Sequence, residues 1–235
     1  MVLVRTRNPL NLGAAARAMS NFGFLHLRAV QPYELAFRET RSAVGASAVM
    51  KQAEEFSTLA EALADCSLVV GTTTLCNRQP QHPMHRLEPA AAAIRQALAT
   101  QRVALLFGSE KVGLSNDDLG HCHWLTHIPT REAHPSMNLG QAVAVCLYEI
   151  ARDETKPIHA PITAQATPPP ASAADLERLT NTLLELLRAS GYLRQTTSEL
   201  DETKLRRLIH RLNLHTEDAD LLLGMLRQIL WKLRS

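Results

Sequence analysis

This 235-residue sequence has no long apolar run and no secretory signal pattern. Ala142–Leu147 is among its longest apolar stretches, whereas a transmembrane helix needs about 18 or more such residues. The first residues are not a basic segment followed by a long apolar one, as in a secretory signal. We therefore expect a cytoplasmic protein with no membrane partner.

Cysteine is scarce and widely spaced, and no C-x-x-C pair is present. The four cysteines are Cys66, Cys76, Cys122 and Cys146. Such spacing favours reduced thiols that pack in the interior over disulfides or metal ligands. His121, Cys122 and His123 are adjacent, but consecutive residues of an extended segment point to opposite faces and cannot close a tetrahedral site alone. We expect no metal.

Aromatic residues are also few: two Trp, three Tyr and five Phe. This scarcity argues against nucleic-acid recognition on an aromatic stacking platform. The net charge of +2 and the pI of about 8.4 permit a nucleic-acid partner without requiring one.

Proline is concentrated in one segment, which divides the chain. Residues 153–174 contain Pro157, Pro161 and the run Pro168–Pro170, a composition that favours extended conformations over a packed core. We predict a linker there, a catalytic domain over residues 1–152 and a helical C-terminal region over residues 175–235.

The first domain alternates short apolar runs with segments of helical period, which is typical of an α/β fold with a mostly parallel sheet. The predicted strands are Met1–Val4, Leu25–Val30, Ser67–Thr72, Val103–Phe107 and Trp124–Ile128. The predicted helices are Leu12–Phe22, Arg41–Gln52, Thr58–Leu63, Pro89–Ala99 and Asn138–Arg152.

The C-terminal region contains three amphipathic segments, predicted as helices over Asp175–Ser190, Asp201–Leu212 and Thr216–Leu233. The middle one carries a cluster of basic residues: Lys204, Arg206, Arg207 and Arg211. This face is either a solvated helix surface or a contact for nucleic acid.

Ligands of open parallel sheets bind beyond the carboxyl ends of the strands, so the segments that follow strands deserve inspection. After the first strand, Asn11 is a good N-cap and Gly23 a good stop for a helix whose only charge is Arg17. An arginine among alanines either extends its head to solvent or has a partner or a function.

Two further segments follow strands. Gly108–Ser115 has the two glycines of a phosphate-binding loop, but Leu114 stands where that loop needs lysine, and the chain has no G-x-G-x-x-G. Before the last helix of the domain, Ser136 and Asn138 either cap that helix or direct its N–H groups at a ligand.

Together these segments resemble one family. N-x-G-x-x-x-R-A-M-x-N-F-G from Asn11, F-G-x-E-x-x-G-L-S from Phe107 and I-P-x(6)-S-M-N-L-x-Q-A-V from Ile128 are similar to the SPOUT superfamily of RNA methyltransferases, and within it to the TrmH-type 2′-O-ribose enzymes. The C-terminal region, with Ala189-Ser-Gly-Tyr and Lys204-Leu-Arg-Arg-Leu, resembles that of the TrmJ subfamily.

The resemblance implies a mostly parallel sheet with a C-terminal deep trefoil knot, a homodimer whose active sites are completed across the interface, S-adenosylmethionine (SAM) as methyl donor, and no metal. It implies tRNA as substrate, with anticodon-loop nucleotide 32 as the target. The residues that match the family's SAM site are Thr72, Thr73, Thr74, Gly108, Ile128, Pro135, Ser136 and Met137. Arg17, Ser136 and Asn138 match catalytic positions, whereas Asn11, Glu110 and Gly113 are expected to shape the site.

Three alternatives stay open at this point. The enzyme could act on rRNA, although many rRNA enzymes of this type carry an N-terminal substrate-binding domain instead of a helical C-terminal one. The fold could bind RNA without catalysis, although Arg17, Ser136 and Asn138 are all present. A dinucleotide-dependent enzyme is disfavoured because its glycine fingerprint is missing.

Overall fold

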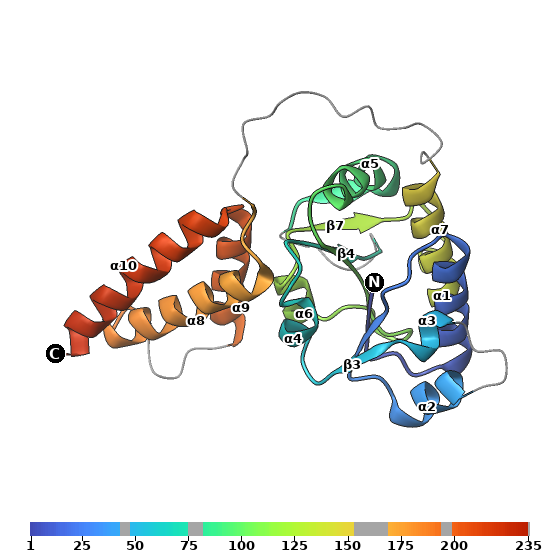
Figure 1. Ribbon diagram of the computed structural model, residues 1–235, viewed down its shortest axis with the longest axis horizontal. Helices are drawn as coiled ribbons and strands as arrows, with labels where there is room; N and C mark the ends of the chain where they lie inside the picture. Colours follow the sequence, from blue (N-terminus) through green and yellow to red (C-terminus); the bar gives the residue numbers. More distant parts are fainter. Residues whose placement is uncertain (43–47, 75–81, 153–168, 194–198, 235) are drawn as a thin grey trace.

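The computed structural model describes residues 1–42, 48–74, 82–152, 169–193 and 199–234, drawn as ribbons in Figure 1. Within these ranges seven strands form one sheet in the order β3-β2-β1-β6-β4-β7-β5, and every neighbouring pair is parallel. The strands are β1 (Val2–Val4), β2 (Arg28–Val30), β3 (Glu54–Phe56), β4 (Leu68–Thr72), β5 (Met84–Arg86), β6 (Val103–Phe107) and β7 (Trp124–His127). The predicted α/β class with a mostly parallel sheet is confirmed.

All five predicted strands are present, with ends that differ by up to three residues. The two that sequence patterns missed, β3 and β5, form the two edges of the sheet. Their sequences, Glu-Glu-Phe and Met-His-Arg, are mostly polar because an edge strand is covered less than a central one.

The helices of the first domain alternate with these strands. They are α1 (Pro9–Asn21), α2 (Glu34–Ser42), α3 (Ala48–Lys51), α4 (Leu59–Leu63), α5 (Leu87–Leu98), α6 (Asn116–Gly120) and α7 (Leu139–Ala151). The helix predicted over Arg41–Gln52 corresponds to the end of α2 and to α3, and residues 43–47 between them lie outside the described residues. The prediction missed α6, a single turn that Ser115 and Asp118 stabilise through a capping box.

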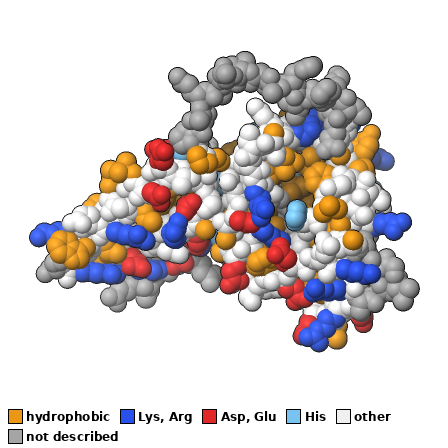
Figure 2. Space-filling view, in the orientation of Figure 1, with side chains coloured by type: hydrophobic (Ala, Val, Ile, Leu, Met, Phe, Trp, Pro, Cys, Tyr) orange, Lys and Arg blue, Asp and Glu red, His pale blue; other side chains and the backbone are white. Residues whose placement is uncertain are grey.

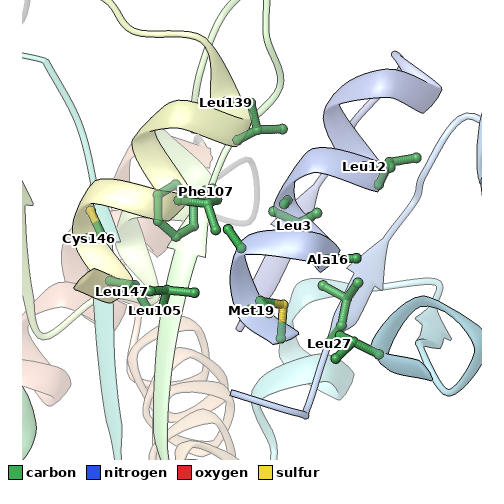
Figure 3. Close-up of a cluster of buried hydrophobic side chains, with 14 of the residues drawn as sticks. Leu3, Leu12, Ala16, Met19, Leu27, Leu105, Phe107, Leu139, Cys146 and Leu147 are labelled. Atoms are coloured by element: carbon green, nitrogen blue, oxygen red, sulfur yellow. The ribbon is translucent and has the colours of Figure 1, made fainter. Parts of the chain in front are cut away.

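Two apolar layers sandwich the sheet. Successive residues of β6 point to opposite sides, so that Leu105 and Phe107 face α1 and α7 while Leu106 faces the other layer. Figure 3 shows Phe107 beside Cys146 of α7. The two helices also touch each other closely, because a Cβ added at Gly140 of α7 would lie 2.6 Å from the Cβ of Ala14 in α1. This contact brings the amino-terminal halves of α1 and α7 together at the carboxyl end of the sheet.

The C-terminal region is a bundle of α8 (Ala173–Ala189), α9 (Glu199–Arg211) and α10 (Thr216–Arg234), in which α8 packs against both others. Helix α8 begins two residues inside the predicted linker, because Ser172 and Asp175 form a capping box there. Residues 153–168 lie outside the described part of the chain, and the division into domains stays a prediction.

This bundle docks on the amino-terminal ends of β4 and β7. The backbone N–H of Ala173 donates to the carbonyl of Cys66 over 2.8 Å, just before β4 begins. The ring of His210 in α9 packs edge-on against His123, just before β7, with 4.8 Å between the ring centroids. Figure 1 shows the bundle beside α4 and α6, on the side of the molecule away from α1 and α7.

The histidines at this junction predict a stability that depends on pH. Burial lowers the pKa of His123 to about 4 and that of His210 well below its ordinary value. Burial, with Arg207 and Arg211 nearby, lowers the pKa of His82 to about 4. A group that is harder to protonate when folded contributes its full stability above an unfolded pKa of about 6.5, and loses it as the pH falls towards the folded value.

We therefore expect thermal unfolding, followed by circular dichroism, to occur roughly 5 °C or more lower at pH 5 than at pH 7.5. His210→Gln should flatten this dependence, whereas replacing the exposed His134 by Gln should leave it unchanged. An unaltered slope in His210→Gln would place the titrating groups elsewhere.

Candidate active site and cofactor pocket

A cavity of about 630 Å³ opens where β4, β6 and β7 end. All eight residues expected to bind the cofactor line it: Thr72, Thr73, Thr74, Gly108, Ile128, Pro135, Ser136 and Met137. So do four of the other predicted site residues: Asn11, Glu110, Gly113 and Asn138. Segments far apart in the sequence thus meet at one end of the sheet, as expected for a parallel sheet, although the role of each residue stays a prediction.

The loop after β6 folds back on itself to form one wall of the cavity. Gly113 has a φ of +69°, a left-handed conformation that favours glycine, and its N–H donates to the carbonyl of Ser109 over 2.9 Å. The chain then passes so close to Gly108 that an added Cβ there would lie 2.0 Å from the carbonyl carbon of Gly113. The glycines shape a turn against which a ligand can approach backbone groups.

Glu110 ties this loop to the start of α1. Its carboxylate accepts hydrogen bonds from the N–H groups of Arg7 (3.2 Å) and Asn8 (3.1 Å) and from Nδ2 of Asn11 (3.0 Å). Although burial opposes ionisation, these bonds hold the pKa of the Glu110 carboxyl below its usual value. An ionised carboxylate with three N–H donors is suited to holding the loop in place.

Asn11 continues this connection to α7. Its Oδ1 accepts a hydrogen bond from Nδ2 of Asn138 (2.8 Å), and Asn138 Oδ1 in turn caps α7 by accepting from the N–H of Gly140 (2.9 Å). The prediction that Asn11 caps α1 was wrong: Asn8 is the cap, with Pro9 in the first turn. Asn11 is buried and joins the three sequence motifs into one polar chain that runs from Glu110 to α7.

Ser136 and Arg17 stand apart from this chain. Ser136 is exposed at the cavity, and Asn138 alone caps α7. Arg17 lies on the exposed face of α1, does not line the cavity, and forms no hydrogen bond or ion pair within the described residues. Leu10 shares that face and is 79% exposed. A single copy of the chain therefore leaves the predicted catalytic arginine outside its own cavity.

The cavity lining offers both apolar and polar groups, which suits a cofactor with both kinds of surface, such as the expected methyl donor. Ile128, Met137 and Ala142 supply apolar surface. Thr126 also lines the cavity, and its buried Oγ1 has no hydrogen-bond partner among the described residues. A buried hydroxyl without a hydrogen-bond partner in the wall of a cavity is typical of a site that completes its hydrogen bonds with a ligand.

The four basic residues of α9 lie far from this cavity, since the bundle docks on the opposite ends of the parallel strands. Arg206 is occupied by ion pairs with Glu177 (3.0 Å) and Asp117 (3.4 Å), and its side chain is 13% exposed. This placement argues against a phosphate contact by Arg206. Lys204 and Arg211 are exposed and Arg207 is half-buried.

Other candidate chemistry is not seen in the described residues. No group of three or more His, Cys, Asp or Glu side chains there could hold a metal ion, and no helix there is long and apolar enough to cross a membrane. Cys66, Cys122 and Cys146 are buried free thiols, and Cys76 lies outside these residues. Burial raises the pKa of Cys146, which touches the cavity, to about 12.

Comparison with known proteins gives results for both parts of the chain. Residues 1–148 match the SpoU rRNA Methylase family. The tRNA (cytidine/uridine-2'-O-)-methyltransferase TrmJ of Yersinia pestis (strain Pestoides F) is 37% identical over 234 residues, which span 97% of this chain and 90% of that protein. The Klebsiella pneumoniae protein of the same name is 36% identical over 238 residues, covering 97% and 95% of the two chains.

A solved structure extends the likeness to three dimensions. The crystal structure of TrmJ from Z. mobilis ZM4 superposes with a TM-score of 0.82 at 32% sequence identity and covers 97% of each chain. The match includes the C-terminal bundle as well as the sheet.

Proposed function

We propose that this chain is a SAM-dependent 2′-O-ribose methyltransferase of tRNA. The chain belongs to the SpoU rRNA methylase family and, within it, to the TrmJ-type enzymes. The observation that carries the proposal is the meeting of all three family motifs around one cavity, in a chain that resembles TrmJ proteins over 97% of its length. We also propose that the segments around this cavity form the family's deep trefoil knot, and that the enzyme acts in the cytoplasm without a metal.

The cavity has the residues that such a donor requires. SAM, when bound, supplies a methyl group on a positively charged sulfonium. Thr72 ends β4, and Thr73 and Thr74 follow it; the three offer hydroxyl and backbone groups, while Ile128 and Met137 offer apolar contacts. Glu110 would keep the wall formed by the Gly108–Ser115 loop in place.

Ser136 and Asn138 would act on the substrate side of the cavity. The exposed hydroxyl of Ser136 would orient the ribose 2′-hydroxyl towards the methyl group, and positioning of this kind lowers a transfer barrier substantially. Asn138 fixes the first turn of α7 and is itself held by Asn11.

Arg17 would stabilise negative charge as it develops on the 2′-oxygen and would clamp the target phosphate. A guanidinium stays protonated in proteins, so a role as general base is excluded. Because Arg17 lies outside the cavity of its own chain, we propose a homodimer in which the partner subunit's Arg17 completes each site. The exposed Leu10 and Tyr148, on α1 and α7, fit such an interface.

The target would be nucleotide 32 of the anticodon loop, a proposal supported by the TrmJ-like C-terminal bundle. The test is transfer of labelled methyl from SAM to unmodified bulk tRNA, followed by nuclease mapping. A single nuclease-resistant 2′-O-methyl linkage at position 32 is expected. Transfer to rRNA alone would favour the rRNA alternative, and SAM binding without any transfer would favour an RNA-binding protein that lacks catalysis.

The basic residues of α9 predict a second measurable effect. If Lys204, Arg207 and Arg211 contact phosphates, replacing all three by Gln should weaken tRNA binding at low salt by roughly tenfold or more and flatten its salt dependence. Because α9 and the cavity lie at opposite ends of the strands, SAM affinity should stay unchanged. Arg86→Gln, at an exposed site in β5, shows what the loss of one positive charge elsewhere on the surface does. Equal salt slopes in all forms would mean that this face is only solvated.

A further inference from the structure

Helix α10 exposes a row of apolar side chains. Leu221, Met225 and Ile229 are four residues apart and are 60%, 50% and 50% exposed. The opposite side of the helix, with Ala219 and Leu223, packs into the bundle core. Hydrophobic side chains are visible along the surface of the bundle in Figure 2. An ordered apolar row on a helix surface is typical of an interaction site, since scattered exposure would not keep this spacing.

The row has an acidic residue at one end and a basic residue at the other. Asp218 lies one turn before Leu221, and Lys232 one turn after Ile229. Neither side chain forms an ion pair within the described residues, although several other charged residues there do, such as Arg188 with Glu202 in the same bundle. Among the residues that the structure describes, the row therefore has an unpaired acid at one end and an unpaired base at the other.

The five residues are arranged symmetrically about Met225. Leu221 and Ile229 are each four positions from it, and Asp218 and Lys232 are each seven. At about 100° per residue, the five side chains fall within an arc of about 80° on one face of the helix. When the row is read backwards, apolar positions meet apolar positions and the acid meets the base.

We propose that this row is a self-complementary contact in which α10 pairs antiparallel with α10 of a second copy of this chain. Met225 then packs against its counterpart at the twofold axis, Leu221 against Ile229, and Asp218 forms an ion pair with Lys232 at both ends. This is the isologous geometry of a twofold interface. A parallel arrangement would instead place like charges opposite each other.

The contact is separate from the dimer proposed for the catalytic domain. Figure 1 shows α10 on the side of the molecule away from α1 and α7. One pair of helices with a contact about 21 Å long is small for a stable interface, so the association should depend on protein concentration. Where both contacts form, the enzyme assembles into more than two copies.

Disulfide trapping tests the twofold axis directly, because one cysteine at the axis lies opposite itself. Under mild oxidation, full-length Met225→Cys should form a covalent dimer at least about tenfold faster than wild type. Arg227→Cys, exposed on a different face of the same helix, is the matched control and should behave as wild type. If Met225→Cys is trapped no faster than the control, the proposal is wrong. The row would then bind something other than a second copy, such as another protein surface, a membrane or RNA.

Charge reversal tests the antiparallel direction. In sedimentation equilibrium Asp218→Lys and Lys232→Asp should each weaken association by roughly tenfold, and the double variant should restore it. Both changes oppose the helix dipole, so a purely structural effect would make the double variant worse than either single one. Failure of the rescue would overturn the antiparallel pairing. SAM binding should be unchanged in every variant, which separates this result from any failure of the proposed methyl transfer.

Discussion

Replacing Arg17 by alanine is expected to reduce methyl transfer to tRNA by two orders of magnitude or more and to leave SAM binding unchanged. The guanidinium does not line the cavity of its own chain, so its removal should not disturb the donor pocket. Removal of one group that stabilises a developing oxyanion typically costs about 10²–10³ in kcat. The two readouts are single-turnover methyl transfer and calorimetric titration with SAM.

Two substitutions on α1 serve as controls for this result. Arg17→Lys keeps the charge but loses the planar fork of donors, and should retain only part of the activity. Ser20→Ala, also exposed on α1, should behave as wild type. If Arg17→Ala loses SAM affinity instead, the arginine belongs to the donor pocket and the proposed role is wrong.

Mixed dimers would show whether Arg17 acts across the subunit interface. Arg17→Ala lacks the arginine, and Gly108→Ala is expected to lack a working donor pocket. If each site takes its arginine from the partner subunit, a mixture of the two inactive variants contains heterodimers. One site of each heterodimer then has both an intact donor pocket and an arginine. Activity should then reappear on mixing. No recovery in verified heterodimers would mean that Arg17 serves its own chain.

The centre of the sheet could be predicted from the sequence because buried parallel strands are apolar on both faces. Val103–Phe107 matches its prediction at both ends. The edge strands β3 and β5 could not be predicted, because polar three-residue strands have no periodicity of their own. Their pairing with β2 and β7 depends on backbone groups that only the folded chain brings together.

The position of the site could also be predicted, since it follows from the rule that ligands bind where parallel strands end. The polar chain through Glu110, Asn11 and Asn138 could not, because its partners are 99 and 127 residues apart. A local signal did exist for the true helix cap. Asn8 directly precedes Pro9, and proline is favoured in the first turn, so the motif predicts a start at Pro9 and frees Asn11 for the site.

The basic residues of α9 are a second case in which partners far apart in the sequence could not be predicted. A cluster of positive residues is visible in the sequence, but the acids that neutralise part of it are not. Arg206 pairs with Glu177, 29 residues earlier, and with Asp117, 89 residues earlier. Arg206 therefore joins the bundle to α6, and its charge is balanced by acids that the sequence pattern does not place beside it.

Replacing Gly108 by alanine should have the largest effect on the donor pocket. The new Cβ would lie 2.0 Å from the carbonyl carbon of Gly113 and 2.1 Å from the backbone nitrogen of Leu114. Both are backbone atoms in the turn that forms one wall of the cavity, so no rotation of a side chain relieves the clash. The loop has to open, and overpacking of this kind costs roughly 1–3 kcal/mol.

We therefore expect Gly108→Ala to bind SAM at least about 100-fold more weakly in calorimetry and to lose methyl transfer. In urea unfolding, the decrease in the free energy of unfolding should be well below the total of about 5–15 kcal/mol that is typical of a domain. The protein should therefore stay folded although its pocket binds SAM poorly. Gly224→Ala is the matched control, since its Cβ would meet nothing within 4 Å. That variant should bind SAM as wild type does and be slightly more stable, because alanine is the better helix former. If Gly108→Ala binds SAM with native affinity, the loop after β6 does not form the donor site. A methyl donor that contacts this wall of the cavity would bind less well once the loop has opened.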